Sequence, residues 1–194
     1  MLQGMTVKHL TLITGSSRGL GAALVAQRLL PGHAVLGLSR QQNVALQAQA
    51  DAAGLALTQW PVDLGDAAPV ALNLAQWLAR LDASALVSVS LINNAGVVGT
   101  LAPLDRVLLA DIVQGLRVGL EAAMLLTAAF LDATRHWSAQ RRVLNISSGL
   151  GRTAMATVRC TALPRPAWTT SAAPWRWSKP ARPTRPAWSR WRRA

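Results

Sequence analysis

The sequence of 194 residues contains no tyrosine and a single cysteine, Cys160. One cysteine excludes a disulfide within the chain, so a cytoplasmic location is expected. No apolar run reaches the roughly 18 residues that a membrane span needs. The first apolar stretch, Leu10 to Ile13, is short and leads directly into Thr14-Gly15, which does not fit a secretory signal peptide. No cluster of His, Cys and acidic residues has metal-ligand spacing, so we expect neither a metal nor a membrane partner.

Acidic residues are also scarce: 8 Asp and Glu stand against 20 Lys and Arg, a formal net charge of +12. Such a charge is typical of nucleic-acid binding. Its distribution argues against this function, because residues 157–194 hold 9 of the basic residues, no acid, 5 of the 8 tryptophans and 6 of the 10 prolines. We therefore interpret residues 1–156 as one domain and residues 157–194 as a basic tail, expected to be disordered.

Residues 1–156 alternate short apolar runs with amphipathic stretches, the pattern of a parallel sheet with connecting helices. The predicted strands are His9–Thr14, Ala34–Leu38, Leu55–Val62, Leu86–Ile92 and Arg142–Ile146. The predicted helices are Leu20–Leu30, Gln41–Ala53, Ala67–Leu81 and, in two pieces, most of Leu104–Trp137. The expected fold class is α/β: a Rossmann-like doubly wound parallel sheet, truncated after about the fifth strand, whose ligands bind beyond the carboxyl ends of the strands.

Glycines dominate the turn after the first predicted strand, which reads T-G-S-S-R-G-L-G over residues 14–21. Glycines at such a turn let the backbone approach a pyrophosphate, and the amides and dipole of the next helix point at the anion. An ordinary glycine-rich strand–helix turn is the alternative, since the spacing is not that of the general dinucleotide fingerprint. Three further motifs follow later strands: Asp63-Leu64, then N-N-A-G over residues 93–96, then Ser147-Ser148.

These motifs, in this order over residues 8–156, resemble those of the short-chain dehydrogenase/reductase family. The stretch L-N-I-S-S-G-L-G-R over residues 144–152 is most similar to small carbonyl reductases of the sepiapterin- and benzil-reductase type. The resemblance implies an oxidoreductase that transfers hydride between a nicotinamide dinucleotide and a small carbonyl or alcohol substrate.

The resemblance also implies roles for individual residues. Ser148 would polarise the substrate carbonyl, Asp63 would hydrogen-bond the adenine amino group, and Leu64 would lie against the adenine ring. The other cofactor-binding candidates form two groups. The loop that would hold the diphosphate and the adenosine ribose consists of Gly15, Ser16, Ser17, Arg18, Gly19, Leu20 and Gly21. The residues that would line the adenosine and nicotinamide ribose region are Asn93, Ala95 and Gly96. Asp63 could instead be a solvated acid or a helix cap near Asp66, and the asparagines could serve turn formation.

The end of the second predicted strand bears on the choice of cofactor. NAD enzymes usually place an acid there to bind the ribose 2′-hydroxyl, whereas this strand ends Leu38-Ser39-Arg40. The guanidinium groups of Arg40 and Arg18 would suit a 2′-phosphate. We therefore expect NADP, with NAD possible if both arginines are merely solvated.

The sequence departs from the family at its acid–base pair. The family's reduction needs a Tyr-x-x-x-Lys pair 13 residues after the serine, in which the lysine lowers the tyrosine pKa. This chain has no tyrosine, and beyond Lys8 its one lysine is Lys179. Gly119 stands where the family usually has an asparagine that supports a water relay, which puts proton supply in doubt.

The tail suggests a cause for the missing pair. Excess Arg, Pro, Ala and Trp is what GC-rich DNA encodes when it is read out of frame. Shifting the frame by one base permits L-Y-C-A-A-K-A-G-L-D-H-F over residues 159–171 and R-V-V-S-L-A-P-G over 186–194. The tyrosine would take the place of Thr161 and the lysine that of Arg165. Our hypothesis is one lost nucleotide near codons 155–158.

Two other functions stay open for the chain as written. It could be a pseudoenzyme that binds the dinucleotide without turnover. The tail could instead bind single-stranded nucleic acid through arginine charge and tryptophan stacking, although its six prolines and a composition typical of an out-of-frame product argue against this partner. Intact family members pair through their fifth helix and the tyrosine-bearing helix, so a homo-oligomer is expected of an intact protein and not of this chain.

Overall fold

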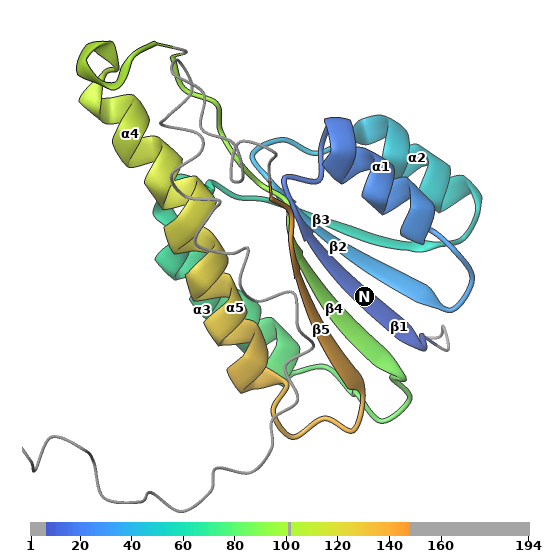
Figure 1. The fold of residues 1–194 in the computed structure, drawn as a ribbon. Coiled ribbons are helices and arrows are strands. Elements are labelled where there is room, and N and C mark those ends of the chain that lie inside the picture. Colours follow the sequence, from blue (N-terminus) through green and yellow to red (C-terminus); the bar gives the residue numbers. More distant parts are fainter. Residues whose placement is uncertain (1–6, 101, 148–194) are drawn as a thin grey trace, which may run out of the picture.

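The computed structural model describes residues 7–100 and 102–147 (Figure 1). Its centre is a sheet of five strands in the order β3-β2-β1-β4-β5. The strands are β1 (His9–Thr14), β2 (His33–Ser39), β3 (Ala56–Pro61), β4 (Ser88–Asn93) and β5 (Gln140–Asn145). Every neighbouring pair is parallel, so all five carboxyl ends lie at one edge of the sheet.

Helices cover both faces of this sheet. The helices α1 (Gly19–Arg28) and α2 (Val44–Ala52) lie on one face, and α3 (Ala67–Ala79) and α5 (Ala122–Ala133) lie on the other (Figure 1). The short helices η1 (Leu64–Asp66) and η2 (Leu104–Arg106) precede α3 and α4 (Leu109–Leu116). A π-helical turn, η3 (Arg117–Glu121), joins α4 to α5.

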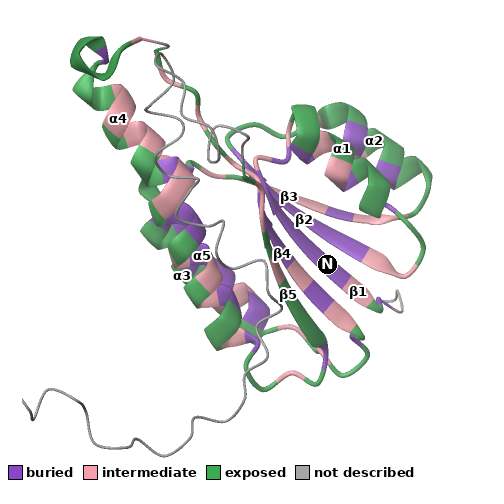
Figure 2. Cartoon of the chain, in the orientation of Figure 1, coloured by how far each residue is buried: buried purple, intermediate pink, exposed green. Residues whose placement is uncertain are grey.

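The core lies in two apolar layers, one on each side of the sheet. The larger packs β1, β2 and β4 against α3 and α5 and includes the fully buried Leu74, Leu126 and Phe130. The smaller packs the other face against α1 and α2 through residues such as Ile13, Val25 and Leu46. Figure 2 shows how burial falls from the centre of the sheet to its β5 edge: β1 and β2 are buried along most of their length, whereas β5 is largely exposed.

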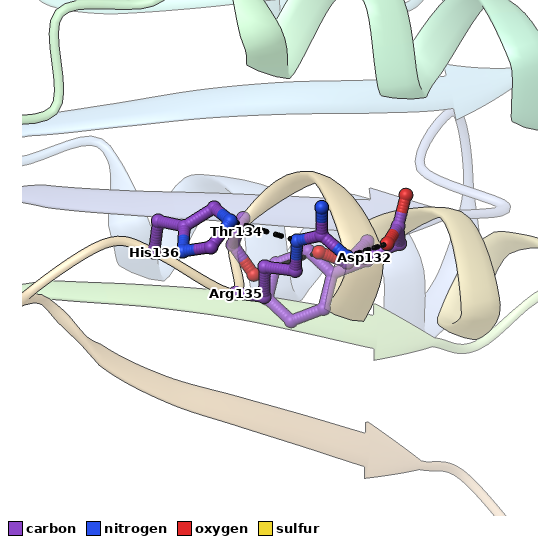
Figure 3. Close-up of polar contacts among 5 residues, drawn as sticks. Asp132, Thr134, Arg135 and His136 are labelled. Atoms are coloured by element: carbon purple, nitrogen blue, oxygen red, sulfur yellow. Dashed lines mark hydrogen bonds and ion pairs between the residues drawn. The ribbon is translucent and has the colours of Figure 1, made fainter.

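The C-terminal end of α5 is fixed by a buried hydroxyl. Thr134 is completely buried, and its Oγ1 donates to the Phe130 carbonyl oxygen at 2.7 Å. Beside it, exposed Arg135 lies 3.3 Å from the Asp132 carboxylate and donates through Nε to His136 Nε2 (Figure 3). The helix therefore ends on one buried hydrogen bond and a set of exposed polar contacts.

The predicted fold class is confirmed. All five predicted strands are present, and their bounds differ from the expected ones by three residues or fewer. The helix expected from Gln41 begins at Val44 instead, because Asn43 caps it. None of the described helices is long and apolar enough to cross a membrane. The predicted tail lies outside the described residues.

Candidate active site

The candidate site lies where the strand order reverses. The chain leaves β1 toward β2 on one side, whereas β4 flanks β1 on the other, so a crevice opens beyond the carboxyl end of β1. The glycine loop fills the turn from β1 to α1, and the Gly15 amide donates to the Leu38 carbonyl oxygen of β2 at 2.7 Å. The expected position of the glycine loop is thus the position at which open α/β sheets bind ligands.

Thr14 joins this loop to the end of β4. Its buried Oγ1 accepts from the backbone amides of Asn94 and Ala95, each at 2.9 Å. The Asn94 side chain adds two hydrogen bonds between the same segments: its Nδ2 donates to the carbonyl oxygens of Thr14 at 3.0 Å and Gly15 at 3.3 Å. Four hydrogen bonds thus join the two motifs, 80 residues apart in sequence, at the sheet edge.

Two glycines of the loop are required by its geometry. Gly19 has φ +55°, in the left-handed region that favours glycine, and a Cβ there would meet nothing within 4 Å. A Cβ on Gly21 would lie 2.0 Å from the Gly15 carbonyl oxygen, which is too close for any side chain at this position. The loop therefore combines close packing against β1 with an open outer surface.

The second strand contributes a buried polar contact. Ser16 and Ser39 are both buried, and their hydroxyl oxygens lie 3.1 Å apart. Ser39 Oγ also donates to the Gln41 carbonyl oxygen at 2.8 Å. A Cβ on Gly37 would lie 2.5 Å from Ser16 Oγ, so this glycine leaves room for the serine. The start of the glycine loop is thereby fixed against the end of β2.

Arg18 and Arg40 emerge from these two segments and are both exposed. Among the described residues the structure records one ion pair, between Arg135 and Asp132, and neither Arg18 nor Arg40 takes part in it. Arg18 is also the residue that precedes the first turn of α1. Arg18 thus stands at the N-terminus of α1, and Arg40 follows Ser39, whose hydroxyl contacts Ser16 of the glycine loop; exposed guanidinium groups on these two segments suit a phosphate.

Asp63 and Leu64 follow β3 as predicted. Asp63 is exposed, and its Oδ1 accepts from the Gly65 amide at 2.8 Å, so it caps η1. This is the capping arrangement that the sequence left open beside adenine binding, and the second carboxylate oxygen leaves both roles compatible. Leu64 is buried and packs into the larger core layer.

Asn93 lies deeper than the other candidates. It is buried, and its Nδ2 donates to Asn145 Oδ1 at 2.8 Å and to Thr127 Oγ1 at 3.1 Å. Its own Oδ1 is buried and accepts no hydrogen bond from the described residues. The Asn93 side chain therefore links β4 to β5 and α5 by hydrogen bonds, and its Oδ1 has no donor among the described residues.

That acceptor borders a small hollow of about 370 Å³ of empty space, partly open to solvent. The hollow lies between the ends of β1, β4 and β5 and the π-helical turn; Thr14, Asn93, Asn145 and Gly119 are among its lining residues. Gly119, which resembles the family's asparagine position, and Asn93, whose Oδ1 has no partner among the described residues, thus line the same hollow.

The segment after β4 is held by a partly exposed acid on α4, Asp111. Asp111 Oδ2 accepts from the Thr100 amide at 2.9 Å and from Thr100 Oγ1 at 2.7 Å. These hydrogen bonds hold the pKa of the Asp111 carboxyl below its usual value of 3.8. Gly96 is exposed on the same segment. Of the serine pair, Ser147 is exposed, and Ser148, the candidate catalytic residue, lies outside the described residues.

Comparison with known proteins identifies the family. A family model described as short chain dehydrogenase matches residues 9–160, and the chain belongs to that family. A benzil reductase ((S)-benzoin forming) of Bacillus cereus is 32% identical over 141 residues, which are 73% of this chain and 57% of that protein. The chain thus spans little more than half the length of this curated relative.

Solved structures agree with this assignment. A short-chain dehydrogenase/reductase from Burkholderia vietnamiensis has a TM-score of 0.74 at 34% identity, covering 84% of this chain and 73% of that chain. A metagenomic short-chain oxidoreductase in complex with NADP has a TM-score of 0.73 at 28% identity, covering 87% and 75%. The family and the fold expected from the motifs are therefore confirmed.

Four residues of this region received no role from the sequence: Thr14, Asn94, Asn43 and Gln59. Thr14 and Asn94 stand inside the motifs, so their hydroxyl and amide were visible as candidates. Asn43 and Gln59 carry no motif, and only the fold shows that they meet.

Proposed function

We propose that residues 7–147 are the cofactor-binding part of an NADP-dependent short-chain reductase. The observation that carries this proposal is the glycine loop at the strand-order reversal, flanked by Arg18 and Arg40 without ion-pair partners among the described residues. A diphosphate would lie against the N-terminus of α1, and the two guanidinium groups would bind the adenosine 2′-phosphate. The short-chain oxidoreductase crystallised with NADP is consistent with this choice.

The residues of this chain would bind and orient the cofactor. Asp63 would accept from the adenine amino group through the carboxylate oxygen that does not cap η1. Ala95 and Gly96 would line the ribose region, on a segment held in place by Thr14. NADPH, when bound, supplies the hydride for reduction of a carbonyl.

We infer that the chain as written does not complete the reaction. It has no tyrosine to protonate a carbonyl oxygen, and Ser148 alone would only polarise it. The family match ends at residue 160, close to Ala156, where the composition changes. Both observations support one lost nucleotide near codons 155–158, so that an intact reading frame would encode the active reductase.

A curated relative supports the substrate class that we propose. The Bacillus cereus relative is a benzil reductase that forms (S)-benzoin. We propose a small aromatic carbonyl compound of that kind as substrate of the intact protein, in the cytoplasm.

Nucleotide binding tests the proposed function on the full chain of 194 residues. Titration with NADPH and NADH, followed by nicotinamide fluorescence, should give tighter binding of NADPH by about tenfold or more, the worth of one charge-assisted hydrogen bond. Arg40→Ala should remove most of that preference, whereas Arg106→Ala, an exposed arginine on η2, should leave it unchanged. A folded chain that binds neither nucleotide would contradict the proposal.

A further inference from the structure

Between the glycine loop and α2, a network of side-chain amides joins three segments that the cofactor would contact. Asn43 lies at its centre. Its Oδ1 accepts from the Leu46 amide at 3.0 Å and caps α2, while its Nδ2 donates to the Ser17 carbonyl oxygen at 2.9 Å. One side chain therefore fixes both the start of α2 and the residue that precedes Arg18.

Gln59, on β3, holds the backbone of Asn43 from the other side. Its Oε1 accepts from the Asn43 amide at 2.7 Å, and its Nε2 donates to the Asn43 carbonyl oxygen at 3.1 Å. The same Nε2 donates to Gln47 Oε1 on α2 at 3.1 Å, and the Gln59 carbonyl oxygen accepts from Gln42 Nε2 at 3.2 Å. Both backbone groups of Asn43 are thus bonded to one partly buried glutamine.

The loop from Arg40 to Gln42 is exposed and lies between two fixed points. At one end, Ser39 is buried, contacts Ser16 and accepts through its carbonyl oxygen from the Val62 amide at 2.9 Å. At the other end stands Asn43, held by Gln59. Arg40 therefore rises from a backbone segment whose two ends are set by hydrogen bonds, and Arg18 follows a residue set by the same asparagine.

We propose that Asn43 and Gln59 are specificity-determining positioning residues, which align Arg18 and Arg40 for the 2′-phosphate of NADP. The proposal rests on the proposed function. A long cationic side chain loses less entropy on binding when its backbone is already fixed, so the network lowers the cost of engaging a phosphate. NADH has no 2′-phosphate, so its binding does not depend on the alignment of these arginines.

Asn43→Ser is the main test variant, because serine retains an oxygen that caps a helix but is too short to reach the Ser17 carbonyl as well. Gln59→Leu removes the two bonds to the Asn43 backbone and the bond to Gln47 Oε1, at nearly constant volume. Gln49→Ala, on the exposed side of α2, is the matched control. Full-length chains are titrated with NADPH and NADH, and also with adenosine 2′,5′-bisphosphate and 5′-AMP, which carry no nicotinamide.

Both test variants should weaken the binding of NADPH and of adenosine 2′,5′-bisphosphate about tenfold, the worth of one charge-assisted hydrogen bond. The affinities for NADH and 5′-AMP should change less than about twofold. A double-mutant cycle adds a second readout: in an Arg40→Ala background, Asn43→Ser should no longer weaken NADPH. Thermal unfolding confirms that each variant is folded, and Asn43→Ser alone decides the outcome if Gln59→Leu does not fold.

Equal weakening of all four nucleotides, or an unchanged preference in folded Asn43→Ser, would overturn the positioning role and leave the proposed function intact. If the unaltered chain binds neither NADPH nor NADH, the proposed function fails, and the positioning role fails with it.

Discussion

Gly21 is the residue at which the candidate site tolerates least change. An added Cβ would lie 2.0 Å from the Gly15 carbonyl oxygen and 2.7 Å from Asn94 Nδ2, so α1 or the loop would have to move. Gly21→Ala should lower the free energy of unfolding by about 1–3 kcal/mol, the usual cost of overpacking. It should also weaken NADPH binding, because the N-terminus of α1 moves. Thermal unfolding and the NADPH titration measure the two effects.

Ala23→Gly is the control for this change, since Ala23 is exposed on the same helix. It should cost about 1 kcal/mol through helix propensity and leave NADPH affinity unchanged. Unchanged stability and affinity in Gly21→Ala would mean that the close approach of α1 to β1 is absent in solution.

His33 makes the stability of the fold depend on pH. It lies opposite His9 in the register of β1 and β2, with ring centroids 4.6 Å apart, and its buried Nδ1 has no partner among the described residues. Burial, followed by the nearby charges of His9 and Arg28, lowers the pKa of His33 below its usual value of 6.5. The unfolded chain therefore binds a proton here more readily than the folded chain does.

It follows that His33 contributes a loss of stability as the pH falls below 6.5, down to its lowered pKa in the folded protein. His33→Gln should reduce the loss in free energy of unfolding between pH 7.5 and pH 5.5, a range of about two units that brackets the unfolded pKa. Gln49→Ala, at an exposed position of α2 without a titratable group, is the control and should keep the loss of the unaltered chain. Identical pH profiles for all three proteins would contradict this origin.

At the scale of the elements, apolar runs located the strands, because the interior strands are buried on both faces and read as continuous hydrophobic segments. The strand β1 was predicted at its observed bounds, His9–Thr14. The start of α2 was placed too early, since residues 41–43 have helical composition but their backbone is held by Ser39 and Gln59. Those partners come from other strands, and no local pattern reveals them.

The joint between α4 and α5 lies inside one continuous helical stretch. The segment from Leu104 to Trp137 was expected to be mostly helical in two pieces; η2 is a short first piece, and α4, η3 and α5 then follow one another without a break. The π-helical turn falls at Arg117–Glu121, around Gly119. Such turns often mark functional sites in helices, and this one borders the hollow next to Asn93.

At the junction of β1 with β4 one hydroxyl, Thr14 Oγ1, accepts hydrogen bonds from two backbone amides, those of Asn94 and Ala95. Thr14→Val keeps the shape but leaves both amides without an acceptor, so it should cost about 2–3 kcal/mol. Thr14→Ser keeps the hydroxyl and should cost about 1 kcal/mol, for one buried methyl group. Chemical denaturation of the two variants measures the difference, and equal losses would show that the hydroxyl is not the element that joins the strands.

The end of α5 allows a buried hydrogen bond to be compared with an exposed ion pair within one turn (Figure 3). Thr134→Val removes the hydroxyl donor from a fully buried place, while the Phe130 carbonyl oxygen keeps the Thr134 backbone amide as a donor, so the change should cost about 0.5–1.5 kcal/mol. Arg135→Ala removes an ion pair whose side chains are 64% and 75% exposed, and should change stability by less than about 0.5 kcal/mol. Equal changes in the denaturation midpoint would contradict the assignment of burial as the deciding factor.

At the scale of the whole molecule, the positions of the candidate site residues could be predicted where those residues belong to a sequence motif. The glycine loop, Asp63, and the asparagine pair lie at the strand ends where they were expected. The contacts that align them were not predictable, because Thr14 meets Asn94 across 80 residues and Ser17 meets Asn43 across 26. Their roles in binding stay predictions until nucleotide binding is measured. Ser148 lies outside the described residues, so its role as the catalytic serine also stays a prediction.

The sheet itself gives a reason to expect further structure in the intact protein. Within the described residues β5 pairs only with β4, and Gln140, Arg141, Arg142 and Leu144 on it are exposed. An edge of this kind has unpaired backbone groups and invites pairing with another strand. Shifting the frame permits an apolar sequence over residues 186–194, which has the composition of such a strand.

Restoring one base near codons 155–158 should therefore change both activity and stability. The restored protein carries a tyrosine in the place of Thr161 and a lysine in the place of Arg165, so it should reduce benzil with NADPH, whereas the chain as written should not. Its unfolding midpoint should be higher, because the edge of β5 becomes paired. The consumption of NADPH and thermal unfolding measure these two effects on matched preparations.

Replacing the restored tyrosine by phenylalanine is the control: NADPH affinity should persist while turnover falls by about 10²–10⁴-fold, the usual contribution of a general acid. Sequencing of the source DNA across codons 150–170 decides whether the base belongs to the gene. If the base is absent there, the loss is part of the gene, and any function of the chain must come from cofactor binding or from the basic tail. If the base is present but the restored protein binds NADPH without oxidising it in the presence of any aromatic carbonyl, the proposed substrate class is wrong while the cofactor assignment stands.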